Sequence, residues 1–257
     1  LRALKAICDK HNLILLEDAC QAIGGTYEGK PLGSYGDLGC FSFDYVKTIT
    51  CGEGGAVITN NETYYKNADH YSDHGHDHVG NDRGAEDHPF LGYNYRISEL
   101  NAAVGVAQVQ RLDEFIAIQK RNYTILRNAL KNVAGVTFRA VPEGGEENYS
   151  FLTFFLPTEE QTRAAHKALG GAGVDACFYW YDNNWHYYKK WSHLTNLTGL
   201  GKIPNEVKEQ MPDYSKSDFS KSDHWVSRTI SCLIKLGWSE EEMQQRADKM
   251  VAAIQSI

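Results

Sequence analysis

The longest periodic pattern of apolar residues in the chain lies between Ile97 and about Val133. Apolar residues recur there at steps of three and four, which is typical of one face of a helix. This pattern predicts a long helix that begins near Ser98, with a kink near Asp113. Gly135 is expected to end it.

Shorter helical patterns occur on both sides of this segment, and two of them begin with capping boxes, Thr158 with Gln161 and Ser239 with Glu242. The predicted helices are Leu1–Lys10, Glu62–Tyr71, Thr158–Leu169 and Ser239 to about Ile257.

Short apolar runs between turn residues predict the strands. The expected strands are Leu13–Leu16, Cys40–Phe43, Ala56–Thr59, Val136–Ala140, Tyr149–Leu156, Val174–Tyr181 and Thr229–Ile234, with a short hairpin at Tyr27–Pro31. Residues 182–223 are aromatic and polar without a clean period, and are expected to be mostly loop. The helix-to-strand step at the start favours an α/β fold with a parallel sheet. We expect a large domain over residues 1–133 and a smaller α+β domain over residues 134–257.

Composition narrows the classes of function. The 257 residues carry a formal net charge of -7, which argues against a nucleic-acid-binding surface. No apolar run approaches the ~20 residues of a membrane helix. Six scattered cysteines without a C-x-x-C pair are expected to be reduced thiols, which favours a cytoplasmic protein.

Lys47 and Asp18 are the candidate catalytic residues. Lys47 lies between two predicted strands and beside the glycine-rich stretch 52–55, where the backbone allows close approach of a ligand. Asp18, with Glu17, follows an apolar strand, and ligands of open α/β sheets bind at such strand ends. The alternatives are an ordinary exposed loop lysine and a helix N-cap aspartate.

A histidine-rich stretch follows the predicted helix 62–71. Residues 72–89 read SDHGHDHVGNDRGAEDHP, a length that is uncommon for a loop without a function. A metal site is one interpretation, but the His-x-His-x-His spacing differs from the i, i+4 pair of a helical zinc site. We favour a solvated loop at a substrate entrance, with His76 and Arg83 binding an acidic sugar and with no metal.

Aromatic residues are concentrated between Tyr179 and Trp191. A platform for stacking a sugar ring is one interpretation. Packing of an irregular segment against its domain is the interpretation that we favour, because aromatic side chains dominate core energetics.

Three stretches, EDACQAIG at 17–24, GDLGCFSFDYVKTITCGEGGAVITN at 36–60 and LGYNYRISELNAAVGVAQVQRLD at 91–113, occur in an order that resembles the DegT/DnrJ/EryC1/StrS sugar aminotransferases. The resemblance covers residues 1 to about 135 in motifs and the remainder in layout. It implies pyridoxal 5'-phosphate (PLP) as cofactor and fold type I, a mostly parallel central sheet with helices on both faces. Members of this family generally carry a further long segment before these motifs, so we expect one to precede Leu1.

The resemblance also implies roles for individual residues. Lys47 matches the lysine that binds the cofactor covalently, Asp18 the aspartate at the pyridine nitrogen, and Gln21 the residue at the ring hydroxyl. Ser42 matches the serine at the phosphate, and Asn94 the asparagine that reaches the phosphate in the neighbouring subunit. A homodimer with a shared active site is therefore expected. Arg96 is a further candidate, for the carboxylate of a substrate.

The expected reaction moves an amino group from L-glutamate to a keto sugar. The stretch DHGHDHVGNDRGAEDHPFLGYNYRISELNAA at 73–103 resembles more narrowly the enzymes that form 8-amino-3,8-dideoxy-manno-octulosonate (Kdo8N), a lipopolysaccharide sugar. This favours 8-keto-3-deoxy-manno-octulosonate as acceptor. The alternatives are a nucleotide-linked 3- or 4-keto-6-deoxy sugar, a non-catalytic regulator that keeps the fold, and a metal-dependent hydrolase that uses the histidine loop.

Overall fold

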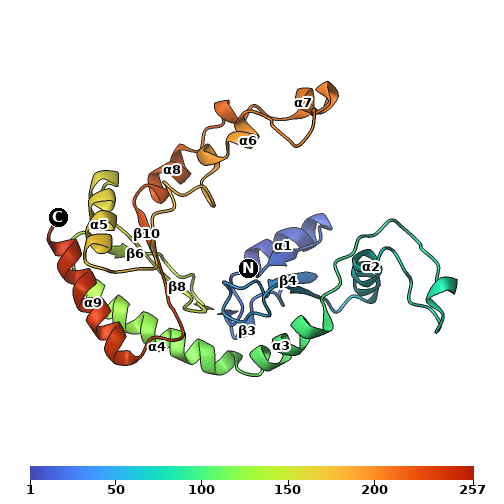
Figure 1. Cartoon of the computed structure of the whole chain (residues 1–257), viewed down its shortest axis with the longest axis horizontal. Coiled ribbons are helices and arrows are strands. Elements are labelled where there is room, and N and C mark those ends of the chain that lie inside the picture. Colours follow the sequence, from blue (N-terminus) through green and yellow to red (C-terminus); the bar gives the residue numbers. More distant parts are fainter. The chain divides into compact units, whose positions relative to one another are not determined.

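The computed structural model describes residues 1–257, apart from the side chain of Ser215. The chain forms two compact units. Figure 1 labels their helices and strands. The first unit comprises Leu1–Lys120 and Val141–Tyr149, and the second comprises Arg121–Ala140 and Ser150–Ile257. Helix α4 (Leu112–Leu130) therefore contributes residues to both units. The expected boundary at residue 133, between a large and a smaller domain, stays a prediction.

The central sheet of the first unit contains three strands in the order β1-β4-β5. The strands are β1 (Leu16–Asp18), β4 (Leu38–Ser42) and β5 (Gly55–Ile58). β1 and β4 are parallel, whereas β4 and β5 are antiparallel, since a loop without a crossover helix joins them.

The first strand begins later than the predicted Leu13–Leu16. The backbone N–H of Leu15 donates to the carboxylate of Asp37 at 2.8 Å, and pairing with β4 begins only at Leu16. The strand therefore includes Asp18 as its last residue, opposite Cys40.

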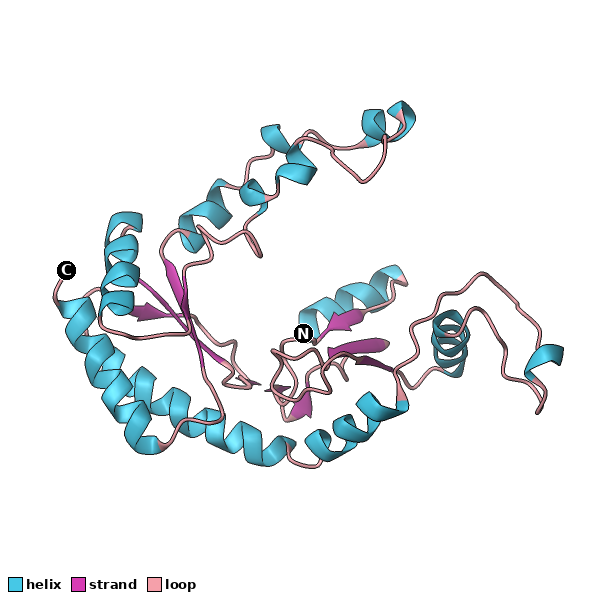
Figure 2. Cartoon of the chain, in the orientation of Figure 1, coloured by secondary structure: helices cyan, strands magenta, loops and turns pink.

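Four helices begin in the first unit: α1 (Arg2–His11), α2 (Glu62–Ser72), α3 (Glu99–Val109) and α4 (Leu112–Leu130), with a short 3-10 helix η1 (Arg83–Ala85). α1 runs alongside the central sheet (Figure 2). Ser98 caps α3 as predicted, accepting a hydrogen bond from the N–H of Asn101. The single long helix of the prediction is instead two helices, because α3 ends at Gln110, close to the expected kink.

A small three-stranded sheet completes the first unit. The predicted hairpin is β2 (Thr26–Tyr27) and β3 (Lys30–Pro31), and β7 (Gly145–Glu146) pairs with its β2 strand. Residues 145–146, which lie outside the predicted strands, thus return the chain to the first unit.

The second unit is built on an antiparallel sheet in the order β6-β8-β10-β9. Its strands are β6 (Thr137–Phe138), β8 (Phe151–Phe155), β9 (Cys177–Phe178) and β10 (Thr229–Leu233). Helices α5 (Glu159–Gly171) and α9 (Glu240–Gln255) pack against each other, and α5 contacts β9 and β10. Thr158 and Ser239 are confirmed as N-caps, but the full capping box forms only at Ser239, because the Gln161 side chain accepts from the Thr158 hydroxyl rather than from its backbone N–H.

The core of this unit is mostly apolar, with Asn122 and Thr162 also fully buried, and its apolar side chains with exposure near zero include Leu152, Phe154, Leu169, Ile230, Met243 and Met250. The prediction of mostly loop for residues 182–223 is wrong in part. Five short helical segments occur there or begin there: η2 (Tyr188–Lys190), α6 (Ser192–Thr195), α7 (Asn205–Gln210), η3 (Tyr214–Lys216) and α8 (Ser220–Val226).

The first unit leaves much apolar surface exposed. Helix α3 buries none of its residues, and Leu100 is 83% exposed. Leu13, Ile14 and Leu16 before and in β1 are each more than half exposed. Exposed apolar side chains in this number indicate that part of this surface contacts other protein. Among the described residues, no helix combines the length and apolar character needed to cross a membrane.

Candidate active site

Two neighbouring parallel strands end at the same edge of the central sheet and place the candidate residues there. Asp18 is the last residue of β1, and Ser42 is the last residue of β4. The register pairs Asp18 with Cys40, two residues before Ser42. This strand edge is where ligands bind in open α/β sheets.

Glu17 and Asp18 point to opposite faces of β1, because side chains alternate along a strand. Glu17 is 9% exposed and its carboxylate accepts hydrogen bonds from the backbone N–H groups of Gly33, Tyr35 and Gly36 at 2.6–2.8 Å. Its role is therefore to hold the loop before β4. Asp18 is exposed and remains available for a ligand.

The carboxylate of Asp18 is held in its ionised form. It accepts a hydrogen bond from the backbone N–H of Cys20 at 3.2 Å. Hydrogen bonds from Cys20, followed by the positive charge of Lys47, lower the pKa of Asp18 below its ordinary value. Burial, and then Asp18 itself, raise the pKa of the Cys20 thiol to about 11, so this thiol stays protonated at neutral pH.

Lys47 lies in the loop that joins β4 to β5. Its backbone N–H donates to the carbonyl of Asp44 at 3.0 Å, which forms a turn. The loop is closed by hydrogen bonds from Cys51 to Phe43 and from Phe43 to Gly54. The side chain of Lys47 is half-buried, and no hydrogen bond or ion pair engages its Nζ within the part of the chain that the structure describes.

Helices α3 and α4 hold this loop from one side, a role that the sequence reasoning missed. The Asn101 side-chain amide donates to the carbonyls of Cys51 and Glu53 at 2.6 and 3.2 Å. Ile49 and Cys51 are 1% and 4% exposed, so the loop is anchored by apolar packing as well. Asn101 and Cys51 are 50 residues apart in the sequence, and no local sequence pattern predicts their contact.

Ser42 and Gln21 are both accessible near this strand edge. The Ser42 hydroxyl accepts a hydrogen bond from the backbone N–H of Asp44 at 3.3 Å, which leaves its own hydrogen for donation. The Gln21 side chain is exposed, and its backbone carbonyl accepts from the side chain of Asn148 at 2.9 Å. The roles of both residues stay predictions.

Asn94 and Arg96 lie further along the first unit. Asn94 is exposed, and its backbone forms an antiparallel bridge with Asp73. The guanidinium of Arg96 pairs with the Asp73 carboxylate. A substrate carboxylate would therefore compete with Asp73 for Arg96, whose proposed role stays a prediction.

Asp73 organises the histidine-rich loop, and the sequence reasoning did not single it out. It is 5% exposed and receives contacts from Arg83 at 2.6 Å, His78 at 3.1 Å and His74 at 3.2 Å. Burial acts to raise the pKa of Asp73, but the hydrogen bonds from these residues and Arg96 outweigh it and hold the pKa well below its usual range. The signal in the sequence for this role is an acidic residue placed among histidines and arginines.

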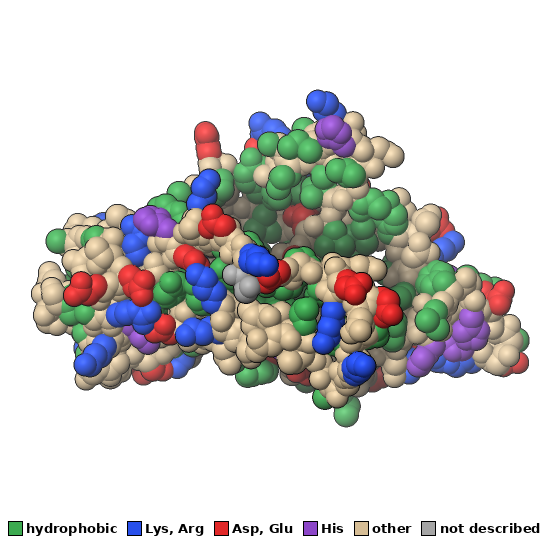
Figure 3. Space-filling model, turned by 90° about the horizontal axis from the view of Figure 1, so that it is seen from above, with side chains coloured by type: hydrophobic (Ala, Val, Ile, Leu, Met, Phe, Trp, Pro, Cys, Tyr) green, Lys and Arg blue, Asp and Glu red, His purple; other side chains and the backbone are tan. Residues whose placement is uncertain are grey.

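His76 is engaged within the same loop. Its Nδ1 lies 2.8 Å from Oε2 of Glu86, an ion pair when the imidazole is protonated, and its ring lies 4.2 Å from that of His88. Figure 3 shows histidine side chains gathered at the end of the view where the segment after α2 lies. The predicted contact of His76 with substrate stays a prediction.

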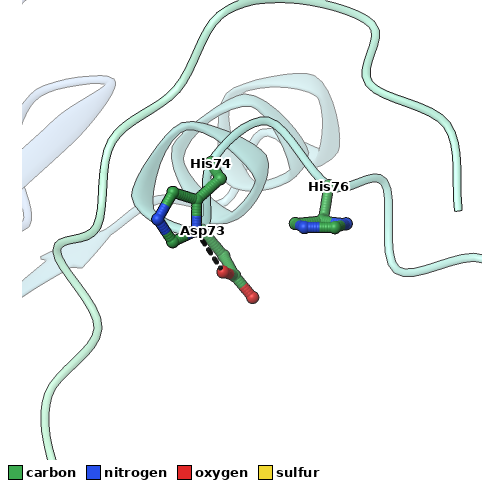
Figure 4. Close-up of side chains that lie close together, drawn as sticks. All are labelled: Asp73, His74 and His76. Carbon is green, nitrogen blue, oxygen red and sulfur yellow. Dashed lines mark hydrogen bonds and ion pairs between the residues drawn. The ribbon is translucent and has the colours of Figure 1, made fainter. Parts of the chain in front are cut away.

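The structure brings together three possible metal ligands in this loop. Ligand atoms of Asp73, His74 and His76 lie within 4.8 Å of one another, and Figure 4 shows the Asp73–His74 contact. The same Asp73 carboxylate binds two guanidinium groups, of Arg83 and Arg96. Their positive charge opposes a divalent cation at this point, which favours the metal-free interpretation.

The aromatic segment of the second unit is largely engaged in packing. Tyr179 and Tyr187 are 5% and 6% exposed, and their hydroxyls donate to the carbonyl of Ser227 and the carboxylate of Asp223, each at 2.9 Å. Trp185, at 61% exposed, is the clearest exception among these rings. The packing interpretation therefore fits the buried members of the segment.

Comparison with known proteins identifies relatives over part of their length. The chain is 35% identical to the lipopolysaccharide biosynthesis protein RfbH of Salmonella typhimurium over 188 residues, covering 65% of this chain and 43% of that protein. It is 36% identical to GDP-perosamine synthase of Vibrio cholerae over 161 residues, covering 62% and 42%. The chain thus spans less than half the length of either relative.

A solved structure agrees in fold. The putative sugar aminotransferase Spr1654 from Streptococcus pneumoniae, in its PLP form, superimposes with a TM-score of 0.72 at 21% identity, covering 95% of this chain and 58% of that one. The expected fold type I architecture is confirmed. Aminotransferases of the matching family depend on pyridoxal phosphate. The family model matches residues 1–251, and the chain accordingly belongs to the DegT/DnrJ/EryC1/StrS aminotransferase family.

Proposed function

We propose that this chain carries the catalytic lysine of a PLP-dependent sugar aminotransferase. The observation that supports this most directly is the electrostatic effect of Lys47 on Asp18, whose pKa its positive charge helps to lower. A half-buried amine without a partner among the described residues lies within the electrostatic influence of an exposed, ionised carboxylate. Both are placed by strands that end at one sheet edge.

The donor set present at this edge fits the proposed cofactor. Asp18 offers an ionised acceptor for a protonated pyridine nitrogen, and Ser42 offers a hydroxyl donor for a phosphate oxygen. Gln21 offers an exposed amide for the ring hydroxyl, and Asn94 an exposed amide for the phosphate in a neighbouring subunit. Lys47 supplies the amine that holds the cofactor covalently.

When bound, pyridoxal phosphate supplies an electron sink that stabilises negative charge on the carbon that loses its proton. The chain's own contribution is then a proton-transfer group. With the cofactor bound, Lys47 would act as general base and then as general acid, taking that proton and returning it. Asp18 keeps the pyridine nitrogen protonated, because its own pKa lies low.

For the substrates, we propose L-glutamate as amino donor and 8-keto-3-deoxy-manno-octulosonate as acceptor, giving Kdo8N for lipopolysaccharide. In support of an acidic acceptor, the histidine-rich loop 72–89 carries Arg83 and four histidines, with His70 before it and Arg96 after it. A nucleotide-linked keto-6-deoxy sugar is the second candidate, favoured by the likeness to GDP-perosamine synthase. Transamination rates with each acceptor, measured on the same preparation, distinguish the two.

We propose further that the protein acts as a cytoplasmic homodimer. The apolar side chains exposed on α3, Leu100, Val104, Val106 and Val109, give that helix a surface suited to a second copy. Asn94 is exposed near the start of the same helix, consistent with a contact to a neighbouring site. Sedimentation of the wild-type protein and a Leu100→Glu variant tests this part separately, since a dimer that persists in the variant would contradict the α3 interface.

The test of the cofactor site is the visible absorption spectrum with added pyridoxal phosphate, before and after borohydride. A yellow band that bleaches, with the cofactor then found on Lys47 by peptide mass spectrometry, is the expected result. Lys47→Arg keeps the positive charge and should abolish both band and label. A folded wild-type protein without the band would contradict the proposal and favour a non-catalytic role.

A further inference from the structure

Two of the six cysteines, distant in sequence, meet in the sheet of the second unit. Cys177 of β9 is the register partner of Cys232 of β10, and their sulfur atoms lie 2.9 Å apart. The remaining cysteines, Cys8, Cys20, Cys40 and Cys51, all belong to the first unit. Neither cysteine of the pair has a role in the proposed site.

The position of the pair within the ladder brings the side chains close. The N–H of Leu233 donates to the carbonyl of Ala176 at 2.9 Å, one residue beyond the cysteines on each strand. This pattern makes Cys177 and Cys232 a non-hydrogen-bonded antiparallel pair, in which the Cα atoms are about 4.5 Å apart. That separation falls within the range of about 4.4–6.8 Å that disulfides span.

One of the two sulfur atoms lies in an electropositive setting. A guanidinium nitrogen of Arg246 is 3.8 Å from Sγ of Cys177, and the Arg246 side chain is only 10% exposed. The hydrogen bond from Cys232, followed by the charge of Arg246, lowers the pKa of Cys177, whereas Cys232 is fully buried and its pKa is raised. Cys177 is therefore the nucleophile of the pair, and Cys232 the proton donor to it.

Cys177, which is only partly buried, is the more accessible of the two cysteines. Arg246 also lines a surface cavity of about 190 Å³, together with Gly173, Val174, Trp238, Glu242, Gln245 and Lys249. The Nε of Arg246 is buried without a hydrogen-bond partner among the described residues.

We propose that Cys177 and Cys232 form a reversible cross-strand disulfide when the protein meets a hydroperoxide. The Cys177 thiolate attacks the peroxide oxygen, which breaks the O–O bond, gives a sulfenic acid at Cys177 and releases hydroxide. Cys232 then attacks that sulfur and displaces the second oxygen, so that two thiols and one hydrogen peroxide give one disulfide and two waters. A dithiol reductant reverses the step.

The disulfide would link the two ends of the long segment that connects β9 to β10. β9 ends at Phe178 and β10 begins at Thr229, so residues 179–228 leave and re-enter the sheet beside the pair. Oxidation therefore constrains the base of the aromatic segment and raises the resistance of the second unit to unfolding. This inference is independent of the proposed aminotransferase activity.

The test uses the full-length chain, reduced, desalted and treated with hydrogen peroxide, then alkylated under denaturing conditions. Mass spectrometry of the unreduced digest is expected to show a Cys177–Cys232 peptide pair, lighter by two hydrogens and released by dithiothreitol. In Cys232→Ser, dimedone should instead trap a sulfenic acid at Cys177. Two outcomes would overturn the proposal. One is sulfinic acid at Cys177 without a crosslink in the wild type; the other is alkylation of both Cys177 and Cys232 after the other cysteines have been oxidised.

A pair of matched variants tests the part played by Arg246. Arg246→Met removes the charge beside Cys177 and is expected to slow crosslinking about tenfold, the effect of one pKa unit on the thiolate fraction. Asp175 contacts both Arg246, at 2.7 Å, and Lys235, at 2.5 Å. Lys235→Met therefore removes a cation from the same neighbourhood without removing Arg246, and is expected to leave the crosslinking rate within about twofold. Equal rates in both variants would overturn the role assigned to Arg246.

Discussion

Glu17 and Asp18 are adjacent in sequence and serve opposite faces of the same strand. Glu17 is buried and accepts three backbone N–H groups of the loop 33–36, whereas Asp18 is exposed at the strand end beside the Lys47 loop. One carboxylate is structural and the other faces the candidate active site. The strand period of two separates the roles of two residues that composition alone cannot distinguish.

Glu17→Gln is expected to destabilise the fold while Asp18→Asn is not. A glutamine at position 17 keeps one oxygen acceptor but presents an NH2 group to one of the buried N–H groups, and such an unsatisfied contact reduces the free energy of unfolding by about 1–3 kcal/mol. The exposed Asp18→Asn change should stay within about 0.5 kcal/mol. Urea unfolding of both variants measures the difference.

The same two variants should show the reverse order in cofactor binding. Asp18→Asn removes the ionised acceptor and should weaken binding of pyridoxal phosphate, measured by its visible band, whereas Glu17→Gln, in its folded fraction, should retain it. Equal losses of stability in the two variants would contradict the assignment of the two faces.

Much of the fold follows from local pattern. The apolar periods of α2, α5 and α9 and the caps at Thr158 and Ser239 are encoded within a few residues, and these elements form where expected. The break at Gln110 was harder to place, because apolar spacing continues across it. The short helices in 182–223 were missed, since segments of three to seven residues carry too little period to detect.

The candidate site also contains residues that the sequence indicates and residues that only the folded chain identifies. Lys47, Asp18 and Ser42 are candidates because family motifs mark them. Asn101 and Asp73 were missed because their roles depend on contacts that only the folded chain creates: Asn101 reaches Cys51 from another element, and Asp73 becomes buried among cationic side chains. Burial of a carboxylate is a tertiary property that spacing cannot convey.

Asn101→Ala is expected to loosen the Lys47 loop. The change removes two hydrogen bonds, to the carbonyls of Cys51 and Glu53, and should raise the dissociation constant of pyridoxal phosphate about tenfold, or about 1.4 kcal/mol. Gln110→Ala, at an exposed position at the end of the same helix, is the control. Unchanged affinity in Asn101→Ala, measured by titration of the visible band, would show that the loop holds its conformation without this contact.

Gly33→Ala should destabilise the protein more than Gly29→Ala. Both glycines have positive φ, +91° and +76°, so alanine pays about 1–2 kcal/mol of backbone strain at either position. At Gly33 the new Cβ would also lie 2.5 Å from Cζ of Phe41, whereas at Gly29 nothing lies within 4 Å. An additional loss of about 1–3 kcal/mol is expected at Gly33. Thermal or urea unfolding that gave equal losses would show that Phe41 moves aside.

The histidine loop is expected to respond to pH through His78. Its Nδ1 lies 2.7 Å from Asp69 and its Nε2 lies 3.1 Å from Asp73, and these hydrogen bonds raise the pKa of His78 above its ordinary value of 6.5. The stabilisation is therefore complete below that ordinary value and is lost as pH rises through the raised pKa. Asp73 has the opposite sign: its lowered pKa stabilises the loop above the ordinary aspartate value of 3.8, and this is lost as pH falls.

Both contributions are present together between these two ordinary values, so the loop should be most protected in mildly acidic solution. NMR titration of the His78 imidazole is expected to give a midpoint above 6.5 in the wild type and a lower one in Asp69→Asn, which removes the carboxylate closer to the imidazole. Asp77→Asn removes the same charge from a carboxylate that accepts from the Val79 N–H, and should shift the midpoint less. Equal shifts in the two variants would mean that general loop charge, rather than the contact with Asp69, sets the titration of His78. Protection of the amides of residues 73–88, measured relative to the intrinsic exchange rate at each pH, should be highest between the two ordinary values and lower on either side, which would connect that titration to the order of the loop.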